Sequence, residues 1–572
     1  MATSDARSGR RTLALGVDYG TSSVRALVVD TATGEEIATA TWTYSHGTDG
    51  VIVDARDPNL ARQHPADYVE GFEKSVRAAV QAASQVPGCS ADAIVGIGVD
   101  TTGSTPLPVD HRGTPLGLLP EFQETPDAMA WLWKDHTSWS EAAEITRRAA
   151  ERGEPYLAKC GGAYSSEWYW SKILHCSRIN PKVAGAATSW VELCDWVPGW
   201  LTGNTDPASM ARSICAAGHK AMYNPQWGGL PSEAFLQELG LPASYRRLYT
   251  KAVPSDRRAG SLREEIARRV GLTPGIPVAV GAFDAHMGAV GSGIRPGTLV
   301  KIMGTSTCDC MVWPMDQRLE DIPGVCGIVP ESIMPGMYGI EAGQSAVGDI
   351  FNWFAARFAT VGPSGGSAED AHRRLTEEAS GLKPGESGLV ALDWNNGNRT
   401  VLVDPRLTGL LIGQTLATTA AEVYLALIEA TAFGALKIIE RIEQYGVKVA
   451  EIVNCGGIAE KSPLVMQVYA DVTGRPMKVS RSSQTCALGA AIFGAVVGGA
   501  HTSVSAAQAA MTGVKSTVYT PRPDAVATYR RLFALYSRLH DAFGVRGCTG
   551  SLDDVMKQLI DLRETVRRGA LA

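Results

Sequence analysis

The stretch that most constrains this chain is Leu13 to Asp30, LALGVDYGTSSVRALVVD. Leu13 to Val17 is apolar enough for a buried strand, and Arg25 to Asp30 has the composition of its hairpin partner. The turn between them carries a carboxylate, a glycine and three hydroxyls, in the order Asp18, Tyr19, Gly20, Thr21, Ser22 and Ser23. Such a turn can aim N–H groups and hydroxyls at a phosphate, and a carboxylate at a strand end suits Mg²⁺. An ordinary hairpin with a polar turn is an equally good interpretation of this stretch alone.

A second stretch of the same form favours the phosphate-binding interpretation over the ordinary hairpin. Thr298 to Trp313, TLVKIMGTSTCDCMVW, consists of an apolar strand, a Gly304-Thr305-Ser306-Thr307 turn and another apolar strand. Two such hairpins indicate two like halves that grip one phosphate chain from opposite sides. The arrangement resembles the actin-like (ribonuclease H-like) ATPases, whose nucleotide binds between two α/β domains. We therefore expect an α/β fold of two such domains with a cleft between them.

Length, charge and cysteine content narrow the class of protein. At roughly 150 residues per domain, 572 residues allow three or four domains, but the repeated hairpin favours two large ones. A net charge of −6 without a basic run does not indicate a nucleic-acid or anionic-membrane partner. The polar start MATSDARSGRR predicts no secretion signal, and Ala487 to Ala500 suits a tightly packed buried helix better than a membrane span. Eleven cysteines without a CxxC pair indicate a reducing, cytoplasmic location.

The first half contains further candidate binding residues. The apolar run Ile94 to Val99 ends in Asp100-Thr101-Thr102-Gly103-Ser104-Thr105, and ligands gather where the strands of α/β sheets end. A capped turn is the alternative. From Pro106 to about residue 275 the chain is rich in tryptophan, including Trp131, interleaved with charged residues, which suits a sugar pocket. Most of these tryptophans are nonetheless expected in the core. Lys220 could reach a cleft, although the sequence around it favours a solvated side chain.

Asp284 is the sharpest single-residue signal. The segment GIPVAVGAFDAHMGAVGSG, residues 275–293, runs from an apolar strand through Asp284 into a helix of small residues. A general base for phosphoryl transfer requires a carboxylate within hydrogen-bond reach of the acceptor hydroxyl. We favour this role for Asp284 over the alternative of a helix cap. Glu341, in a glycine-flanked turn, is either an acceptor for a sugar hydroxyl or a helix cap.

Paired glycines mark a further turn in the second half. Asn454-Cys455-Gly456-Gly457 follows an apolar strand and leads into a predicted helix. Paired glycines let a backbone approach a base or a phosphate closely. After the two hydroxyl-rich hairpins, this turn is a reasonable candidate for the nucleotide.

These residues together resemble the FGGY family of carbohydrate kinases over residues 12–545. The matching strings are DYGTSSVR, GAFDAHMG, GTSTCD, LTGLLIG followed by EATAFGA, and NCGGIAE. Longer strings, among them GIGVDTTGSTPLP, YSSEWYWSKILH and IEAGQSAVGDI, resemble the bacterial L-ribulokinases within that family. The resemblance implies ATP-dependent phosphorylation of the 5-hydroxyl of L-ribulose, with Mg²⁺, to give L-ribulose 5-phosphate in arabinose catabolism. The alternatives are another pentulose or polyol kinase, for D-ribulose, xylulose or glycerol, and a non-kinase actin-like switch ATPase.

The resemblance also implies a role for each matched position. Asp284 would be the general base, and Asp18 with Asp284 would hold Mg²⁺. The sugar contacts would be Gly103, Trp131, Lys220, Asp284 and Glu341. The phosphates would lie against Gly20, Thr21, Ser22, Ser23, Arg25, Gly304, Thr305 and Ser306, and the adenosine against Asn454, Gly456, Gly457 and Lys461.

The resemblance implies three segments as well: an N-terminal domain with a sugar-binding insertion (residues 12–290), a nucleotide-binding C-terminal domain (291–545) and a helical tail (546–572). One departure concerns the base. Many family members place an asparagine after the glycine pair where this chain has Lys461-Ser462. This leaves the preference for ATP less constrained. A homodimer is the assembly that the family leads us to expect.

Overall fold

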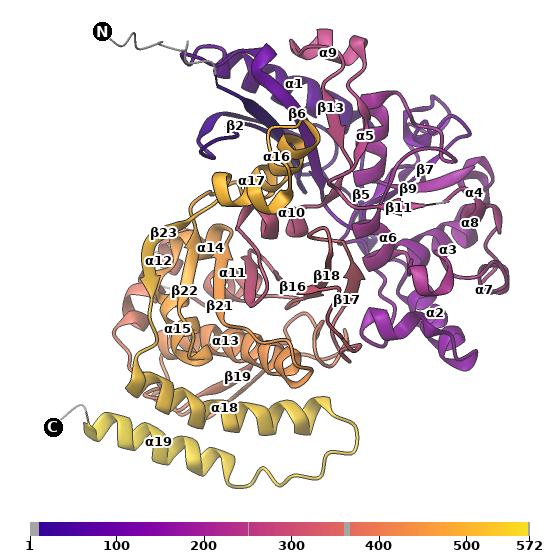
Figure 1. The fold of residues 1–572 in the computed structure, drawn as a ribbon. Coiled ribbons are helices and arrows are strands. Elements are labelled where there is room, and N and C mark those ends of the chain that lie inside the picture. The colour runs from indigo at the N-terminus through magenta and orange to yellow at the C-terminus, as the bar shows by residue number, and fades with distance from the viewer. Residues whose placement is uncertain (1–10, 250, 360–366, 570–572) are drawn as a thin grey trace, which may run out of the picture.

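The computed structural model describes residues 11–249, 251–359 and 367–569, and within these ranges the chain forms two α/β halves (Figure 1). Each half is built on a seven-stranded mixed sheet. Among the described residues, no helix is both long enough and apolar enough to cross a membrane.

The N-terminal sheet has the strand order β12-β13-β6-β1-β2-β3, with β14 also beside β6. The predicted hairpin is confirmed, because β1 and β2 pair antiparallel from Leu13↔Asp30 to Tyr19↔Val24. β6 lies parallel to β1 on its other side. The strands are β1 (Leu13–Tyr19), β2 (Ser23–Asp30), β3 (Glu36–Thr43), β6 (Ile94–Thr101), β12 (Arg258–Ser261), β13 (Pro277–Ala279) and β14 (Ala282–Phe283).

The C-terminal sheet repeats this connectivity in the order β17-β18-β16-β15-β21-β22-β23. Its central hairpin β15–β16 is antiparallel, and β21 lies parallel to β15 as β6 does to β1. The expectation of two like halves from the two hairpins is therefore confirmed. The strands are β15 (Thr298–Met303), β16 (Thr307–Pro314), β17 (Gly327–Pro330), β18 (Met337–Ala342), β21 (Glu451–Cys455), β22 (Met477–Ser480) and β23 (Val514–Tyr519).

The aromatic-rich segment between β6 and β12 forms a helical layer beside the N-terminal sheet (Figure 1). Its aromatic side chains make a core cluster of their own. The helices are α2 (Trp139–Glu151), α3 (Tyr169–Ile179), α4 (Pro181–Ala186), α5 (Leu193–Thr202), α6 (Ile214–Lys220), α7 (Glu233–Glu238) and α8 (Ser244–Arg247). The short strands near this layer are β4 (Ile52–Asp54), β5 (Asp57–Gln63), β7 (Pro106–Val109), β8 (Ala130–Trp131), β9 (Ser189–Glu192), β10 (Arg212–Ser213) and β11 (Ala252–Val253).

Helix α16 (Thr485–Val497) crosses from the C-terminal half to the N-terminal sheet, where it packs on β1, β6 and α10 (Asp284–Gly291). Its backbone touches the strands directly. A Cβ atom on Gly16 or on Gly98 would lie 1.8 Å from a carbonyl oxygen of α16. The buried small-residue helix expected at 487–500 therefore joins the two halves, together with α10. On the outer face of the N-terminal sheet lie α1 (Pro65–Ala83) and α9 (Glu264–Val270).

Apart from α17 (Val504–Met511), which packs on α16 and α10, the remaining helices build the C-terminal half. α13 begins with a capping box in which the Thr419 hydroxyl and the Glu422 carboxylate each accept a backbone N–H. In the segment expected as a helical tail, α19 packs Val555, Leu559 and Leu562 into the main core of this half. The elements are α11 (Gly348–Phe354), α12 (Ala368–Ser380), α13 (Ala420–Gln444), α14 (Gly457–Lys461), α15 (Pro463–Thr473), α18 (Pro523–Gly544), α19 (Val555–Gly569), β19 (Val390–Leu392) and β20 (Leu410–Ile412).

Candidate active site

Three carboxylates meet at one edge of the N-terminal sheet. Parallel pairing places Asp18 of β1 beside Asp100 of β6, and Asp100 beside Ala282 of β14. Asp284 follows β14 directly as the first residue of α10. Because the carboxyl ends of parallel strands share one edge, turns that are far apart in the sequence converge here.

The carboxylates crowd one another in a buried setting. Burial, followed by the charge of Asp18, raises the pKa of Asp284 to about 7. Asp100 is fully buried, and within the described ranges neither of its carboxyl oxygens has a hydrogen-bond partner. Burial and the two neighbouring carboxylates raise its pKa well above the usual range. Arg25 Nη1 lies 3.5 Å from Asp18 Oδ2 and offsets part of this negative charge.

Asp100 was predicted only as part of a candidate binding turn, without a role of its own beside Asp18. Its signal is the same as that of Asp18, a carboxylate at the end of an apolar strand. The sequence does not give the register of β1 against β6, and this register places the two carboxylates side by side.

The first hairpin turn is held in a fixed conformation. The N–H of Gly20 donates to Ser23 O at 2.9 Å and closes the turn. Two side chains that the sequence prediction missed fix Thr21, because Trp133 Nε1 donates to its hydroxyl at 3.1 Å and Gln63 Nε2 to its carbonyl at 2.7 Å. An indole N–H only donates, so the Thr21 hydroxyl keeps its own proton for another acceptor.

The second hairpin turn and the glycine turn lie at the same edge of the C-terminal sheet. Parallel pairing of Ile302 with Cys455 sets the ends of β15 and β21 side by side. Gly304 and Thr305 are exposed, and Ser306 is half-buried. Gly456 adopts a φ of 93°, which favours glycine, and its Cβ would lie 2.5 Å from Met303 O. Gly457 and Lys461, on the following helix α14, are exposed.

Two predicted contacts do not face a ligand. Trp131 has no exposed surface, and the Arg62 guanidinium lies 3.3 Å from the centre of its ring, so the expectation that it lies against a sugar is wrong. Asn454 is also fully buried, and its amide donates to Lys478 O at 3.0 Å inside the sheet. The sequence pattern around these two residues does not separate core positions from exposed ones.

Lys220 and Glu341 form an ion pair between the two halves. Lys220 Nζ, at the end of α6, donates to Glu341 Oε1 on β18 at 2.6 Å. The sequence around Lys220 favoured a solvated side chain. This prediction is wrong, because the side chain is only 7% exposed. Against the opposing effect of burial, the Lys220 ammonium holds the pKa of Glu341 well below its usual range. The pKa of Asp284 responds to both Glu341 and Lys220, so the pair lies near that carboxylate.

The Gly103 turn rests on a buried polar network. The Ser104 hydroxyl donates to the Glu192 carboxylate, which also accepts the N–H of Thr105 at 2.8 Å. Lys172 Nζ donates to Ser104 O at 2.9 Å. Burial raises the pKa of Glu192 and lowers that of Lys172. The network fixes the backbone on which half-buried Gly103 sits.

Comparison with known proteins gives two matching family models. The N-terminal domain of the FGGY family of carbohydrate kinases matches residues 13–291, and the C-terminal domain of that family matches residues 299–497.

Named relatives and solved structures agree with these matches. A ribulokinase of Vibrio parahaemolyticus is 42% identical over 92% of this chain and 95% of its own length. A ribulokinase of Halalkalibacterium halodurans is 41% identical over 97% of this chain and 98% of its own. The crystal structure of a xylulose kinase from Rhodospirillum rubrum has a TM-score of 0.76 at 23% identity, over 93% of this chain and 98% of that one. The last likeness concerns the fold alone.

Proposed function

Since the chain belongs to the FGGY family of carbohydrate kinases, we propose that it phosphorylates L-ribulose at its 5-hydroxyl with ATP. Relatives that are 41–42% identical over nearly the whole chain are named ribulokinases, which supports the choice of sugar. The product would be L-ribulose 5-phosphate, as arabinose catabolism requires. The eleven free cysteines fit a reducing, cytoplasmic location.

The position of Asp284 carries this proposal. Asp284 follows β14, which pairs with Asp100 of β6, and its pKa responds to the charges of Asp18, Glu341 and Lys220, so it lies near both the carboxylates and the ion pair. A carboxylate there can accept the proton of a sugar hydroxyl while the phosphates lie against the hairpin turns. Its pKa of about 7 suits a general base, since such a group works best near the operating pH.

The carboxylate edge fits Mg²⁺. Oxygen donors are the ligands that Mg²⁺ takes, and the Asp100 carboxylate is buried without a hydrogen-bond partner in the described ranges. Asp18, Asp284 and Asp100 are the residues that would hold it. When bound, Mg²⁺ supplies positive charge for the phosphate oxygens.

The two hairpin turns would hold the phosphates. The Thr21 hydroxyl can donate its free proton, and the exposed side chains of Ser22 and Thr305 add further hydroxyl donors. Phosphoryl transfer depends mainly on alignment and charge stabilisation, which donors from two domains provide when the halves close together. Closure would also exclude water and suppress hydrolysis of ATP.

The Lys220–Glu341 pair would bind the sugar. An ammonium donates to hydroxyl oxygens, and a carboxylate accepts hydroxyl protons, so the pair matches neighbouring hydroxyls. Because Lys220 comes from α6 and Glu341 from β18, sugar binding would draw the two halves together.

The test is ADP release with Mg-ATP and a panel of L-ribulose, D-ribulose, L- and D-xylulose and glycerol. We expect the highest kcat/KM with L-ribulose and little release without sugar. A maximum with another sugar would reassign the pocket, and sugar-independent release would favour a switch ATPase.

Replacing the base tests the role of Asp284. Asp284→Asn should lower kcat by on the order of 10²–10⁴ while sugar binding stays measurable, because a general base contributes about that much. Asp524→Asn, at an exposed position in the first turn of α18, is the matched control and should keep full turnover. Turnover of Asp284→Asn near that of the control would remove Asp284 from the mechanism.

A further inference from the structure

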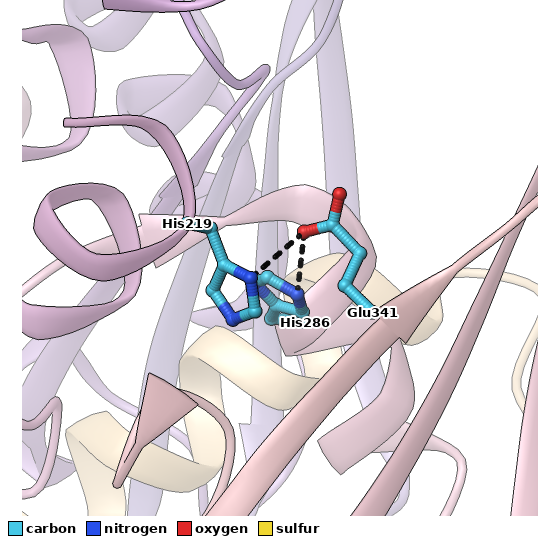
Figure 2. A group of neighbouring side chains, drawn as sticks. All are labelled: His219, His286 and Glu341. Carbon is cyan, nitrogen blue, oxygen red and sulfur yellow. Dashed lines mark ion pairs between the residues drawn. The ribbon is translucent and has the colours of Figure 1, made fainter. Parts of the chain in front are cut away.

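Two histidines converge on the carboxylate of Glu341 (Figure 2). His219 comes from α6, His286 from α10 and Glu341 from β18, so the cluster joins both halves of the protein. The two histidine side chains are 0% and 2% exposed, and that of Glu341 is 12% exposed.

The three facing atoms have the spacing of metal ligands. Glu341 Oε2 lies 3.5 Å from His219 Nδ1 and 3.1 Å from His286 Nε2, and all three atoms fall within 4.8 Å of one another. Ligands bound at about 2.0–2.1 Å in a tetrahedron lie roughly 3.3 Å apart. Two of the three separations therefore already match a tetrahedral site.

Each inward-facing nitrogen is paired only with the Glu341 carboxylate in the part of the chain that the structure describes. Within the described residues, neither His219 Nδ1 nor His286 Nε2 makes a hydrogen bond, although both are buried. The Ser332 hydroxyl donates to Val329 O at 3.1 Å, so towards His219 Nε2, 3.0 Å away, it can only accept. His219 Nε2 therefore carries the ring proton and leaves a bare lone pair on Nδ1, directed at a carboxylate.

The outer nitrogens of both rings are anchored, as in metal sites. Ser332 holds His219, and Cys215 Sγ lies 2.7 Å from His286 Nδ1. Metal-ligating histidines nearly always bind a second group through the other ring nitrogen, which fixes the tautomer and the ring orientation.

We propose that His219, His286 and Glu341 bind a divalent transition-metal cation of the Zn²⁺ type. Two imidazoles and one carboxylate suit such ions, whereas Mg²⁺ prefers oxygen ligands and belongs at the aspartate edge. The cation would link the two halves through Glu341 Oε2 and leave its fourth position open.

The ammonium of Lys220 should weaken metal binding at this site. Its ammonium lies 2.6 Å from Glu341 Oε1, so the carboxylate would bridge an ammonium and the metal. Two neighbouring cations repel each other, and loss of the ammonium should strengthen metal binding. Loss of a metal ligand would instead weaken binding, so tighter binding without the ammonium would distinguish Lys220 from a ligand.

The test is titration of the metal-free full chain with Co²⁺, followed by its visible absorption, and with Zn²⁺ by calorimetry. ATP, Mg²⁺ and sugar are left out, so the result does not depend on the kinase activity. A Cys548→Ser background removes the exposed thiol. We expect one ion per chain and an absorption spectrum without a thiolate charge-transfer band.

Variants decide whether these residues are the ligands. Ser332→Ala should weaken binding by roughly 10–100-fold, the usual cost of losing an outer partner, and His219→Phe and Glu341→Gln by more. Lys220→Met should tighten it. Thermal unfolding of each variant checks that it is folded, and Ser332→Ala keeps all three ligands should the others fold poorly. Absence of binding to the unmodified chain, equal affinity in His219→Phe, or no change in Lys220→Met would overturn the proposal.

Discussion

Replacing Gly98 with alanine would place a methyl group between β6 and α16. The added Cβ would lie 1.8 Å from Ala490 O, and its other nearest atoms also belong to the helix backbone. Real Cβ atoms essentially never come closer than 3.0 Å to such an atom. Strand and helix would therefore have to separate by at least about 1.2 Å, which a close-packed interior resists.

The magnitude follows from the nature of the obstacle. Inserting a methyl group into a packed core costs about 1–3 kcal/mol, and a backbone obstacle belongs at the upper end because it cannot change rotamer. In domains of 150–250 residues each kcal/mol lowers Tm by about 2–4 °C, so we expect Gly98→Ala to lose several degrees. Asp100 is two residues further along β6, so a displaced strand should also lower kcat.

Scanning calorimetry and the coupled assay measure both effects. Gly185→Ala is the matched control, because Gly185 lies in α4 with no atom within 4 Å of a new Cβ. There alanine should stabilise the helix by about 0.5–1 kcal/mol. An unchanged Tm and kcat in Gly98→Ala would refute the close contact between α16 and the sheet.

Three further predictions concern charged groups. Burial raises the pKa of Glu429 to about 8, so its stabilising protonated form is lost as pH rises. Relative to Glu429→Gln, the free energy of unfolding of the wild type should therefore fall by up to about 1.4 kcal/mol per pH unit between pH 5 and 8. Urea unfolding measures this difference, and a difference that does not change with pH would contradict the prediction. Glu167 Oε1 pairs with Arg399 Nη2 at 3.2 Å between the two halves, and Glu167→Gln should raise the sugar KM by at most roughly fivefold with kcat unchanged. A large loss of kcat would show a different role. Asp100→Asn should raise the Tm of the metal-free protein and weaken Mn²⁺ binding by roughly 10-fold; a lower Tm would mean that Asp100 is only structural.

Local signals explain what could be predicted from the sequence. The hairpins around Gly20 and Gly304 each combine strand periodicity with turn chemistry in fewer than about 20 consecutive residues, and both were correctly placed. Their likeness led to the correct fold of two similar halves. Asp284 stood out because a carboxylate among small and apolar residues is unusual.

Burial was the weak point of the prediction. Trp131 and Asn454 were both predicted to contact a ligand, yet both are fully buried. The residues around Lys220 predict a solvated side chain, but its ammonium pairs with Glu341 of the other half. A side chain's exposure depends on what packs against it from elsewhere in the chain, and the flanking residues do not carry that information.

The sequence by itself determined the strands, the turns and the chemistry that each turn offers, since these depend on residues a few positions apart. Only the tertiary structure decided which turns meet. Strand register brought Asp100 beside Asp18, and the packing of α6, α10 and β18 brought His219 and His286 to Glu341. These partners are separated by tens to more than a hundred residues, and contacts at such distances are set by the burial of whole sheets and helices rather than by any local pattern.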